Sequence, residues 1–90
     1  GLAMRAGQVV SGDDTTLKEL KKGKISLVIV ADDASENTKK LFKDKSSYRK
    51  INQIYFSTKV ELGLAIGKSP RAVIGIKDKS LASKITELMQ

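Results

Sequence analysis

The chain contains neither cysteine nor histidine. Their absence excludes a disulfide framework, a zinc finger, a thiol nucleophile, a Ser-His-Asp triad and an imidazole general base. The most apolar stretch, residues 25–31, is far shorter than the roughly 20 residues that a membrane-spanning helix needs. Large classes of enzymes and metal proteins are therefore excluded before any motif is considered.

Aromatic residues are also scarce: there is no tryptophan, and the chain has only Phe42, Tyr48, Tyr55 and Phe56. Their positions in the expected helices and strands place most of them in the core. A protein that holds single-stranded RNA by stacking its bases needs aromatic rings at the surface. This mode of binding is therefore disfavoured, and structured RNA fits better.

Positive charge is what the chain has in excess. Seventeen Lys and Arg stand against ten Asp and Glu, which gives a net charge of +7 and a pI near 9.8. Such an excess favours a polyanionic partner, with nucleic acid the leading candidate and an anionic membrane surface the second. The other interpretation is a solvated, lysine-rich surface without a partner.

The length and composition indicate one globular domain over residues 1–90. The chain is 40% apolar and 30% charged, and ninety residues suffice for a single core. Strands are expected over residues 25–31, 54–56 and 72–76, with a short apolar pair at 9–10. Helices are expected at 2–6, after the capping residues of 11–16, after Ser35 or Asp33, after Ser57 or Thr58, and after Ser80. This alternation predicts an α/β fold, a three-layer α/β/α sandwich with a mixed, mainly parallel four-stranded sheet.

Apolar spacing predicts which helical residues face the core, and two glycines are expected to end helices, Gly23 and Gly67. The residues expected to point inward are Leu17, Leu20, Thr38, Leu41, Phe42, Lys45, Tyr48, Val60, Leu64, Ile66, Leu81, Ile85 and Leu88.

One segment imitates a phosphate-binding loop. Residues 63–69 read Gly-Leu-Ala-Ile-Gly-Lys-Ser, but only three residues separate the glycines, whereas the nucleotide-binding loop has four. That loop also lies between a strand and a helix, and here a helix comes first, with Pro70 and a strand after it. Nucleoside triphosphate binding is therefore disfavoured.

Two acidic pairs, Asp13-Asp14 and Asp32-Asp33, are candidates for magnesium ligands or for paired acid/base catalysts. Both pairs lie at expected helix starts, where Asp is favoured for capping and for its interaction with the helix dipole. We favour the capping interpretation, and we therefore expect no catalytic residue, no metal and no cofactor.

Three segments, in this order and spacing, resemble one family. They are residues 11–18 leading to 22–24, residues 27–34 and residues 61–68. Together they resemble the kink-turn-binding ribosomal proteins, the large-subunit "seven-Ae/thirty-e" type. Within that superfamily the chain is most similar to the small bacterial YlxQ-like branch, through its Gly-Leu-Ala-Met-Arg-Ala opening and the Asp-Ala-Ser-Glu-Asn-Thr segment at 33–38.

The resemblance implies an α/β/α sandwich that binds kinked helical RNA, a bulge flanked by tandem sheared G·A pairs. In such proteins the glycine-led start of the second helix enters the groove at the G·A pairs, and the loop after the fourth helix covers the extruded nucleotide. Glycine there allows close approach of the backbone, and Lys18 can donate to guanine or phosphate. The implied RNA-binding residues are Gly12, Asp13, Asp14, Thr15, Lys18, Lys22, Lys59, Ile66, Gly67, Lys68, Ser69, Pro70 and Arg71.

The chain departs from the family at Asp14 and Thr15, where relatives commonly have Asn or Lys followed by Glu or Gln. A carboxylate cannot donate to guanine O6 or N7, although it accepts from guanine N2 or cytosine N4. We expect a monomeric, cytoplasmic protein without catalytic activity that binds structured RNA, ribosomal RNA included, and no membrane. The alternative is a protein-interaction module of the same fold that docks an acidic partner.

Overall fold

The computed structural model describes residues 8–88, which form four strands and four helices. The expected opening helix at 2–6 lies outside the described residues. In chain order the elements are β1 (Val9–Ser11), α1 (Asp13–Lys21), β2 (Leu27–Val30), α2 (Glu36–Tyr48), β3 (Asn52–Tyr55), α3 (Lys59–Ala65), β4 (Val73–Ile76) and α4 (Lys79–Leu88).

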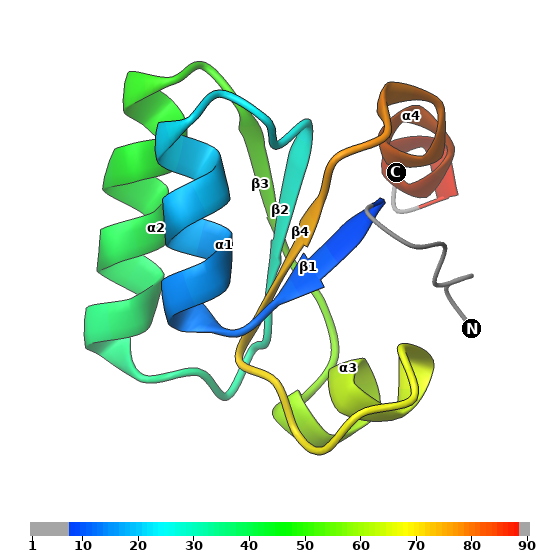
Figure 1. The fold of residues 1–90 in the computed structure, drawn as a ribbon. Helices are drawn as coiled ribbons and strands as arrows, with labels where there is room; N and C mark the ends of the chain where they lie inside the picture. Colours follow the sequence, from blue (N-terminus) through cyan, green and yellow to red (C-terminus); the bar gives the residue numbers. More distant parts are fainter. Residues whose placement is uncertain (1–7, 89–90) are drawn as a thin grey trace.

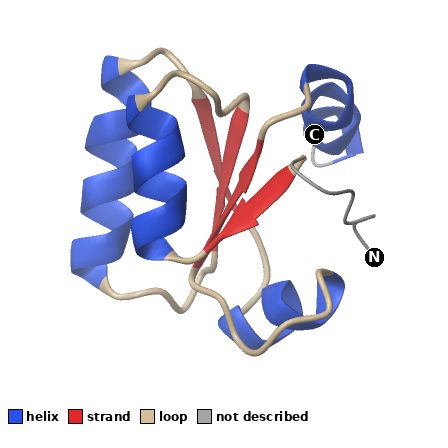
Figure 2. Ribbon diagram, in the orientation of Figure 1, coloured by secondary structure: helices blue, strands red, loops and turns tan. Residues whose placement is uncertain are grey.

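The sheet is mixed, with the strand order β1-β4-β2-β3. Helices α1 and α2 cover one of its faces, and α3 and α4 lie on the other (Figures 1 and 2). The expected α/β fold with helices on both sides of a four-stranded mixed sheet is thus confirmed. The expectation that the sheet is mainly parallel is wrong, because only β2 and β3 are parallel, whereas β4 is antiparallel to both β1 and β2.

The lengths of two helices explain the strand directions. Helix α2 has 13 residues, about 20 Å at 1.5 Å per residue, and returns the chain along the sheet so that β3 is parallel to β2. Helix α3 has 7 residues, about 10 Å, and the chain re-enters the sheet at the end where it left. Strand β4 therefore runs antiparallel to β2, and the loop before it lies at the same end of the sheet as the start of α1 (Figure 1).

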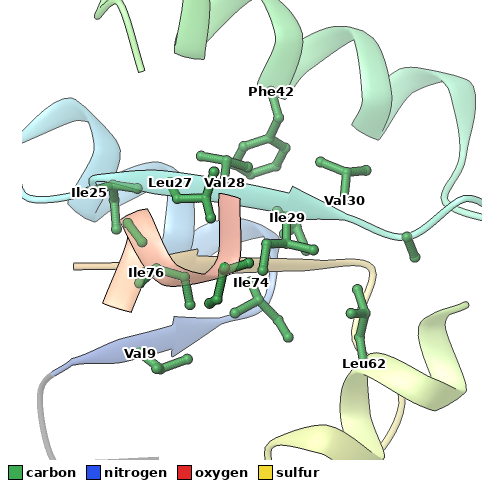
Figure 3. Close-up of a cluster of buried hydrophobic side chains, with 14 of the residues drawn as sticks. Val9, Ile25, Leu27, Val28, Ile29, Val30, Phe42, Leu62, Ile74 and Ile76 are labelled. Atoms are coloured by element: carbon green, nitrogen blue, oxygen red, sulfur yellow. The ribbon is translucent and has the colours of Figure 1, made fainter. Parts of the chain in front are cut away.

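The core lies on both faces of β2 and β4, whose eight residues are all buried. Successive residues of β2 point to opposite sides: Val28 and Val30 lie on the side of Phe42, and Ile29 on the other (Figure 3). Leu62 reaches the core from α3. The continuous apolar run at 25–31 thus reflects coverage by helices on both sides, and this coverage does not require parallel strands.

Several helical residues expected to face the core are exposed instead. Tyr48, Val60, Leu64 and Leu88 are 82%, 54%, 68% and 83% exposed, and Lys45 is exposed as well. The buried stripes run through Phe42 and Ser46 in α2, Leu62 and Gly63 in α3, and Ala82 and Ile85 in α4. Ser46, Gly63 and Ala82 are small and let the helices pack closely. A search for large apolar residues overlooks such positions.

The aromatic residues also depart from the prediction. Phe42 is buried, but Tyr55 and Phe56 are 44% and 46% exposed, in addition to Tyr48. Tyr55 ends β3, which is an edge strand, and Phe56 follows it directly. The expectation that the aromatic rings are mostly core is therefore wrong, and aromatic surface is available for contacts.

Four of the predicted helix ends are confirmed, whereas α4 begins at Lys79, before Ser80, and no side chain caps α1. Ser35 caps α2 by accepting from the Thr38 N–H at 3.1 Å, and Thr58 caps α3. Gly23 and Gly67 both have positive φ and close Schellman motifs: the amide of Lys24 donates to the Glu19 carbonyl at 3.1 Å, and that of Lys68 to the Gly63 carbonyl at 2.8 Å.

Replacing Thr16 by Val should stabilise the protein. Thr16 is fully buried in α1, and its hydroxyl has no hydrogen-bond partner among the described residues. Valine keeps the shape and removes the unpaired polar group, so the free energy of unfolding should rise by about 1 kcal/mol. Urea denaturation measures it. Thr15→Val, at the exposed neighbouring position, is the control and should not share the gain. A clear loss in Thr16→Val would contradict the assignment of an unpaired hydroxyl.

Candidate nucleic-acid interface

The start of α1 and the loop between α3 and β4 lie side by side at one end of the sheet (Figure 1). Arg71 Nε, in the loop, donates at 3.2 Å to the hydroxyl of Ser11, which ends β1 just before α1, and the Gly12 amide donates at 3.0 Å to the carbonyl of Val73, the first residue of β4. We call the surface formed by residues 12–15, Lys18, Lys59 and residues 67–71 the proximal surface.

The start of α1 exposes backbone. Its N-cap is Gly12, with φ 90° and ψ 153°, and no side chain caps the helix. That conformation is open essentially to glycine alone. A Cβ added to Gly12 would meet nothing within 4 Å, so the space in front of this residue is free. Amides at an uncapped helix start are natural donors to phosphate or base acceptors.

The acidic residues at this end have structural partners, but not the expected ones. Asp13 and Asp14 lie in the first turn of α1 and do not cap it, because the cap is Gly12. The Asp13 carboxylate accepts from the Thr38 hydroxyl at 3.2 Å and so links α1 to α2. Asp33 accepts from the Lys59 amide at 2.9 Å, so it supports the start of α3 and not that of α2.

The α3–β4 loop folds tightly against its own helix. A Cβ added to Gly63 would lie against the Ser69 carbonyl oxygen, 2.7 Å from its carbonyl carbon and 2.9 Å from the Lys68 carbonyl oxygen. Arg71 holds the loop from the other side, since its Nη1 donates to the Ser69 hydroxyl at 2.7 Å and to the Ser69 carbonyl at 3.1 Å. The Arg71 amide donates to the Lys59 carbonyl at 3.0 Å.

Most of the sequence-predicted RNA-binding residues meet at the proximal surface, and two do not fit there. Ile66 is 5% exposed, so its side chain packs beneath the loop and presents little surface. Lys22 is the C-cap of α1, ten residues beyond Gly12, which is about 15 Å along the helix. The exposed ones are Asp13, Asp14, Thr15, Lys18, Lys59, Gly67, Lys68, Ser69 and Pro70, with Gly12 and Arg71 half-buried.

Sequence reasoning missed the role of Gly63. Gly63 belongs to the segment that imitates a phosphate-binding loop, yet its place in the structure is where the backbone of Lys68 and Ser69 lies against α3. A glycine in the middle of a short helix, followed four residues later by a second glycine, was the available signal, because glycine disfavours a helix interior unless close packing requires it.

The proximal surface is not where the positive charge of the chain is concentrated. Around it lie six carboxylates and five cations: Asp13, Asp14, Asp32, Asp33, Glu36 and Glu61 against Lys18, Lys39, Lys59, Lys68 and Arg71. Contacts there must therefore depend more on shape and backbone donors than on net charge.

This chain belongs to the class of small α/β proteins in which a mixed four-stranded sheet lies between two layers of helices. An uncapped helix start lies beside a tight loop at one end of its sheet. The chain is a member of the Ribosomal protein L7Ae/L30e/S12e/Gadd45 family, whose model matches residues 1–86. The resemblance noted from the sequence is thereby confirmed.

Individual relatives agree with this assignment. The chain is 46% identical to RNA-binding protein YlxQ of Enterococcus faecium, over 100% of this chain and 86% of the relative. It is 39% identical to RNA-binding protein YlxQ of Bacillus subtilis (strain 168), over 99% and 89%. A solved structure of a Bacillus halodurans protein of unknown function superposes with a TM-score of 0.90 at 36% identity, covering 94% of this chain and 86% of that one.

Proposed function

We propose that this protein binds structured RNA, and that the proximal surface recognises a kink-turn-like element, a bulge flanked by tandem sheared G·A pairs. The observation that carries the proposal is that the glycine-led start of α1 and the loop of residues 67–71 lie side by side, with Arg71 bonded to Ser11 just before the helix. Two segments far apart in the sequence thereby form one exposed surface. The names of the YlxQ relatives, which are RNA-binding proteins, support the choice of RNA.

Each part of the surface has a chemical role in this proposal. The uncapped amides at the start of α1 donate to acceptors at the G·A pairs, and Lys18 donates to guanine O6 and N7 or to phosphate. Asp14 accepts from guanine N2 or cytosine N4. The loop, held in place by Arg71 and by its contact with Gly63, covers the extruded nucleotide with Gly67, Lys68, Ser69 and Pro70. No step of this function is catalytic.

The proposal also covers the target RNA, the cellular location and the oligomeric state. The family description names ribosomal proteins, which favours ribosomal RNA or another structured RNA of the bacterial cytoplasm as the target. No helix in residues 8–88 is long and apolar enough to cross a membrane. We propose a single RNA-binding domain that acts as a monomer.

Replacing Lys18 by Ala should weaken binding to a kink-turn duplex about tenfold, because a lost guanine or phosphate contact costs about 1–3 kcal/mol. Lys18 is exposed, so folding should be unchanged. Gel-shift titrations measure the affinity for the kink-turn duplex and for a duplex whose G·A pairs are replaced by Watson–Crick pairs.

Lys40→Ala, an exposed cation in the middle of α2, is the matched control and should keep full affinity. Equal binding of the wild-type protein to both duplexes would contradict kink-turn recognition. Absence of RNA binding, together with capture of an acidic protein segment, would favour the alternative of a protein-interaction module.

A further inference from the structure

The positive charge of the chain is concentrated at the end opposite the proximal surface, where α1 and α2 end (the upper end in Figure 1). Residues 21–24 and 44–50 contain six cations and one carboxylate, Asp44. We call Lys21, Lys22, Lys45, Tyr48, Arg49 and Lys50 the distal surface; all six are exposed. Lys22, which the sequence assigned to the RNA site, belongs to this surface.

The two helix ends meet here in space. The Arg49 guanidinium donates from Nη2 to the Lys21 carbonyl and so ties the end of α2 to the end of α1. A small hollow of about 100 Å³ lies between them, lined by Leu20, Lys21, Lys45, Tyr48 and Arg49. Lys21, Lys45 and Arg49 therefore line one hollow together with Tyr48.

The helix dipole does not account for this charge. Two helix C-termini carry about half a negative charge each, so one or two cations would balance them. The six cations of residues 21–24 and 44–50 include Lys24, and after Asp44 and the two helix ends are balanced they leave an excess of about four positive charges. Lys24 also adjoins a larger hollow of about 620 Å³, which is lined by Lys77 and Lys79 as well. This excess fits a ligand with several negative charges.

Tyr48 indicates which polyanion fits. Its side chain is 82% exposed, and the Arg49 guanidinium carbon lies 5.9 Å from the centre of its ring. An exposed ring surrounded by cations matches the way in which single strands are held, with phosphates on Lys and Arg and a base stacked on the aromatic ring. Single-stranded RNA uses both features together, since its phosphates contact the cations and a base stacks on the ring.

We infer that the distal surface binds a single-stranded RNA segment that flanks the structured element held at the proximal surface. The inference rests on the proposed function for the identity of the RNA. The molecule extends 29 × 28 × 26 Å, so a flanking strand must run about that length to reach the distal surface. The proximal surface then supplies recognition of shape, and the distal surface supplies most of the electrostatic affinity.

The first test compares a kink-turn hairpin with the same hairpin carrying a 3′ single-stranded tail of about twenty nucleotides, and a twin hairpin tailed at the 5′ end. Even at about 3.4 Å per nucleotide, the length in a stacked strand, such a tail is longer than the 29 Å extent of the protein. One of the tailed RNAs should bind at least tenfold more tightly than the bare hairpin, and its affinity should fall more steeply with salt. The triple variant Lys21→Gln, Lys22→Gln, Lys45→Gln should lose that gain and reduce the salt slope by about 2.

The matched control is the triple variant Lys40→Gln, Lys43→Gln, Lys84→Gln, which removes the same charge from exposed positions on α2 and α4. It should keep the gain from the tail. Arg49 is left unchanged because it ties the two helices together. No gain from either tail, or a gain that survives in the distal variant, would overturn the inference.

Tyrosine fluorescence gives an independent readout, because the chain has two tyrosines and no tryptophan. In Tyr55→Phe, Tyr48 is the sole tyrosine, and the tail should quench its emission. In Tyr48→Phe, only Tyr55 remains, and the tail should leave its emission unchanged. An unquenched Tyr48 would refute the stacking contact.

The outcomes separate the two proposals. If kink-turn recognition fails, the bare hairpin shows no preference over its control duplex, while an isolated twenty-nucleotide strand still binds the wild type and not the distal variant at low salt. If the distal inference fails, the kink-turn preference remains and the tail has no effect. A polyglutamate peptide that bound the wild type, with no gain from either tail, would instead indicate an acidic protein partner.

Discussion

Gly63→Ala should destabilise the protein and weaken its binding to a kink-turn RNA. In an ordinary helix interior the same substitution is stabilising by about 0.5–1 kcal/mol. At Gly63 the new methyl group would press on the Ser69 carbonyl and lie 2.9 Å from the Lys68 carbonyl oxygen, which are backbone atoms that cannot move alone. The loop must shift away from α3, and we expect the free energy of unfolding to fall by about 1–3 kcal/mol.

The RNA affinity of Gly63→Ala should fall at least tenfold, because residues 67–71 are the part of the proximal surface that moves. Thermal denaturation and gel-shift titration measure the two effects, and amide chemical shifts should change mainly in the loop. Val60→Ala is the control: Val60 lies in the same helix and is 54% exposed, so the substitution should leave both quantities nearly unchanged. A rise in melting temperature for Gly63→Ala would show that the loop does not pack on α3.

Local signals in the sequence predicted the fold well because they act over a few residues. Ser35 and Thr58 were recognised as helix starts by their side-chain oxygens, and Gly23 and Gly67 as helix ends by their tolerance of positive φ. The apolar run at 25–31 identified the most buried strand. Each of these features is decided by the residue and its immediate neighbours.

What the sequence did not predict depends on long-range geometry. The direction of β4 follows from α3 being too short to return along the sheet, which the alternation of strands and helices alone does not show. The exposure of Tyr48 and Leu64 follows from how each helix is rotated against the sheet. Apolar spacing along a helix shows that one side is apolar, but it does not show which residues of that side reach the core. The role of Gly63 depends on a loop that no local pattern describes.

The family resemblance places the candidate site at the start of α1 and in the 67–71 loop, two segments that lie side by side in the structure. The start of α1 and the 67–71 loop meet, as that interpretation requires. The distribution of charge was not foreseen, because a count of lysines along the sequence does not show that six carboxylates offset five cations at one end of the sheet, whereas six cations face one carboxylate at the other. Lys22 lies apart from the start of α1 because it is the C-cap of that helix, ten residues beyond Gly12.

Gly12→Val should weaken kink-turn binding more strongly than any other substitution at the start of α1. Gly12 has φ 90° and ψ 153°, its amide donates to the Val73 carbonyl at 3.0 Å, and its carbonyl accepts from the Thr16 amide at 3.1 Å. A branched side chain disfavours that conformation by about 1–3 kcal/mol and projects into the space where we place the RNA backbone. We expect at least a tenfold loss of affinity together with a moderate loss of stability.

Gly23 provides the control that separates backbone strain from loss of RNA contact. It has φ +75° at the other end of α1, and a Cβ added there also meets nothing within 4 Å. Gly23→Val should therefore lower the melting temperature about as much as Gly12→Val, while binding to a short kink-turn hairpin stays near the wild-type value. If the two variants lose affinity equally, the loss reflects weakened folding; if Gly12→Val binds normally, the start of α1 does not approach the RNA backbone. Only a loss confined to Gly12→Val supports a close backbone approach at this glycine.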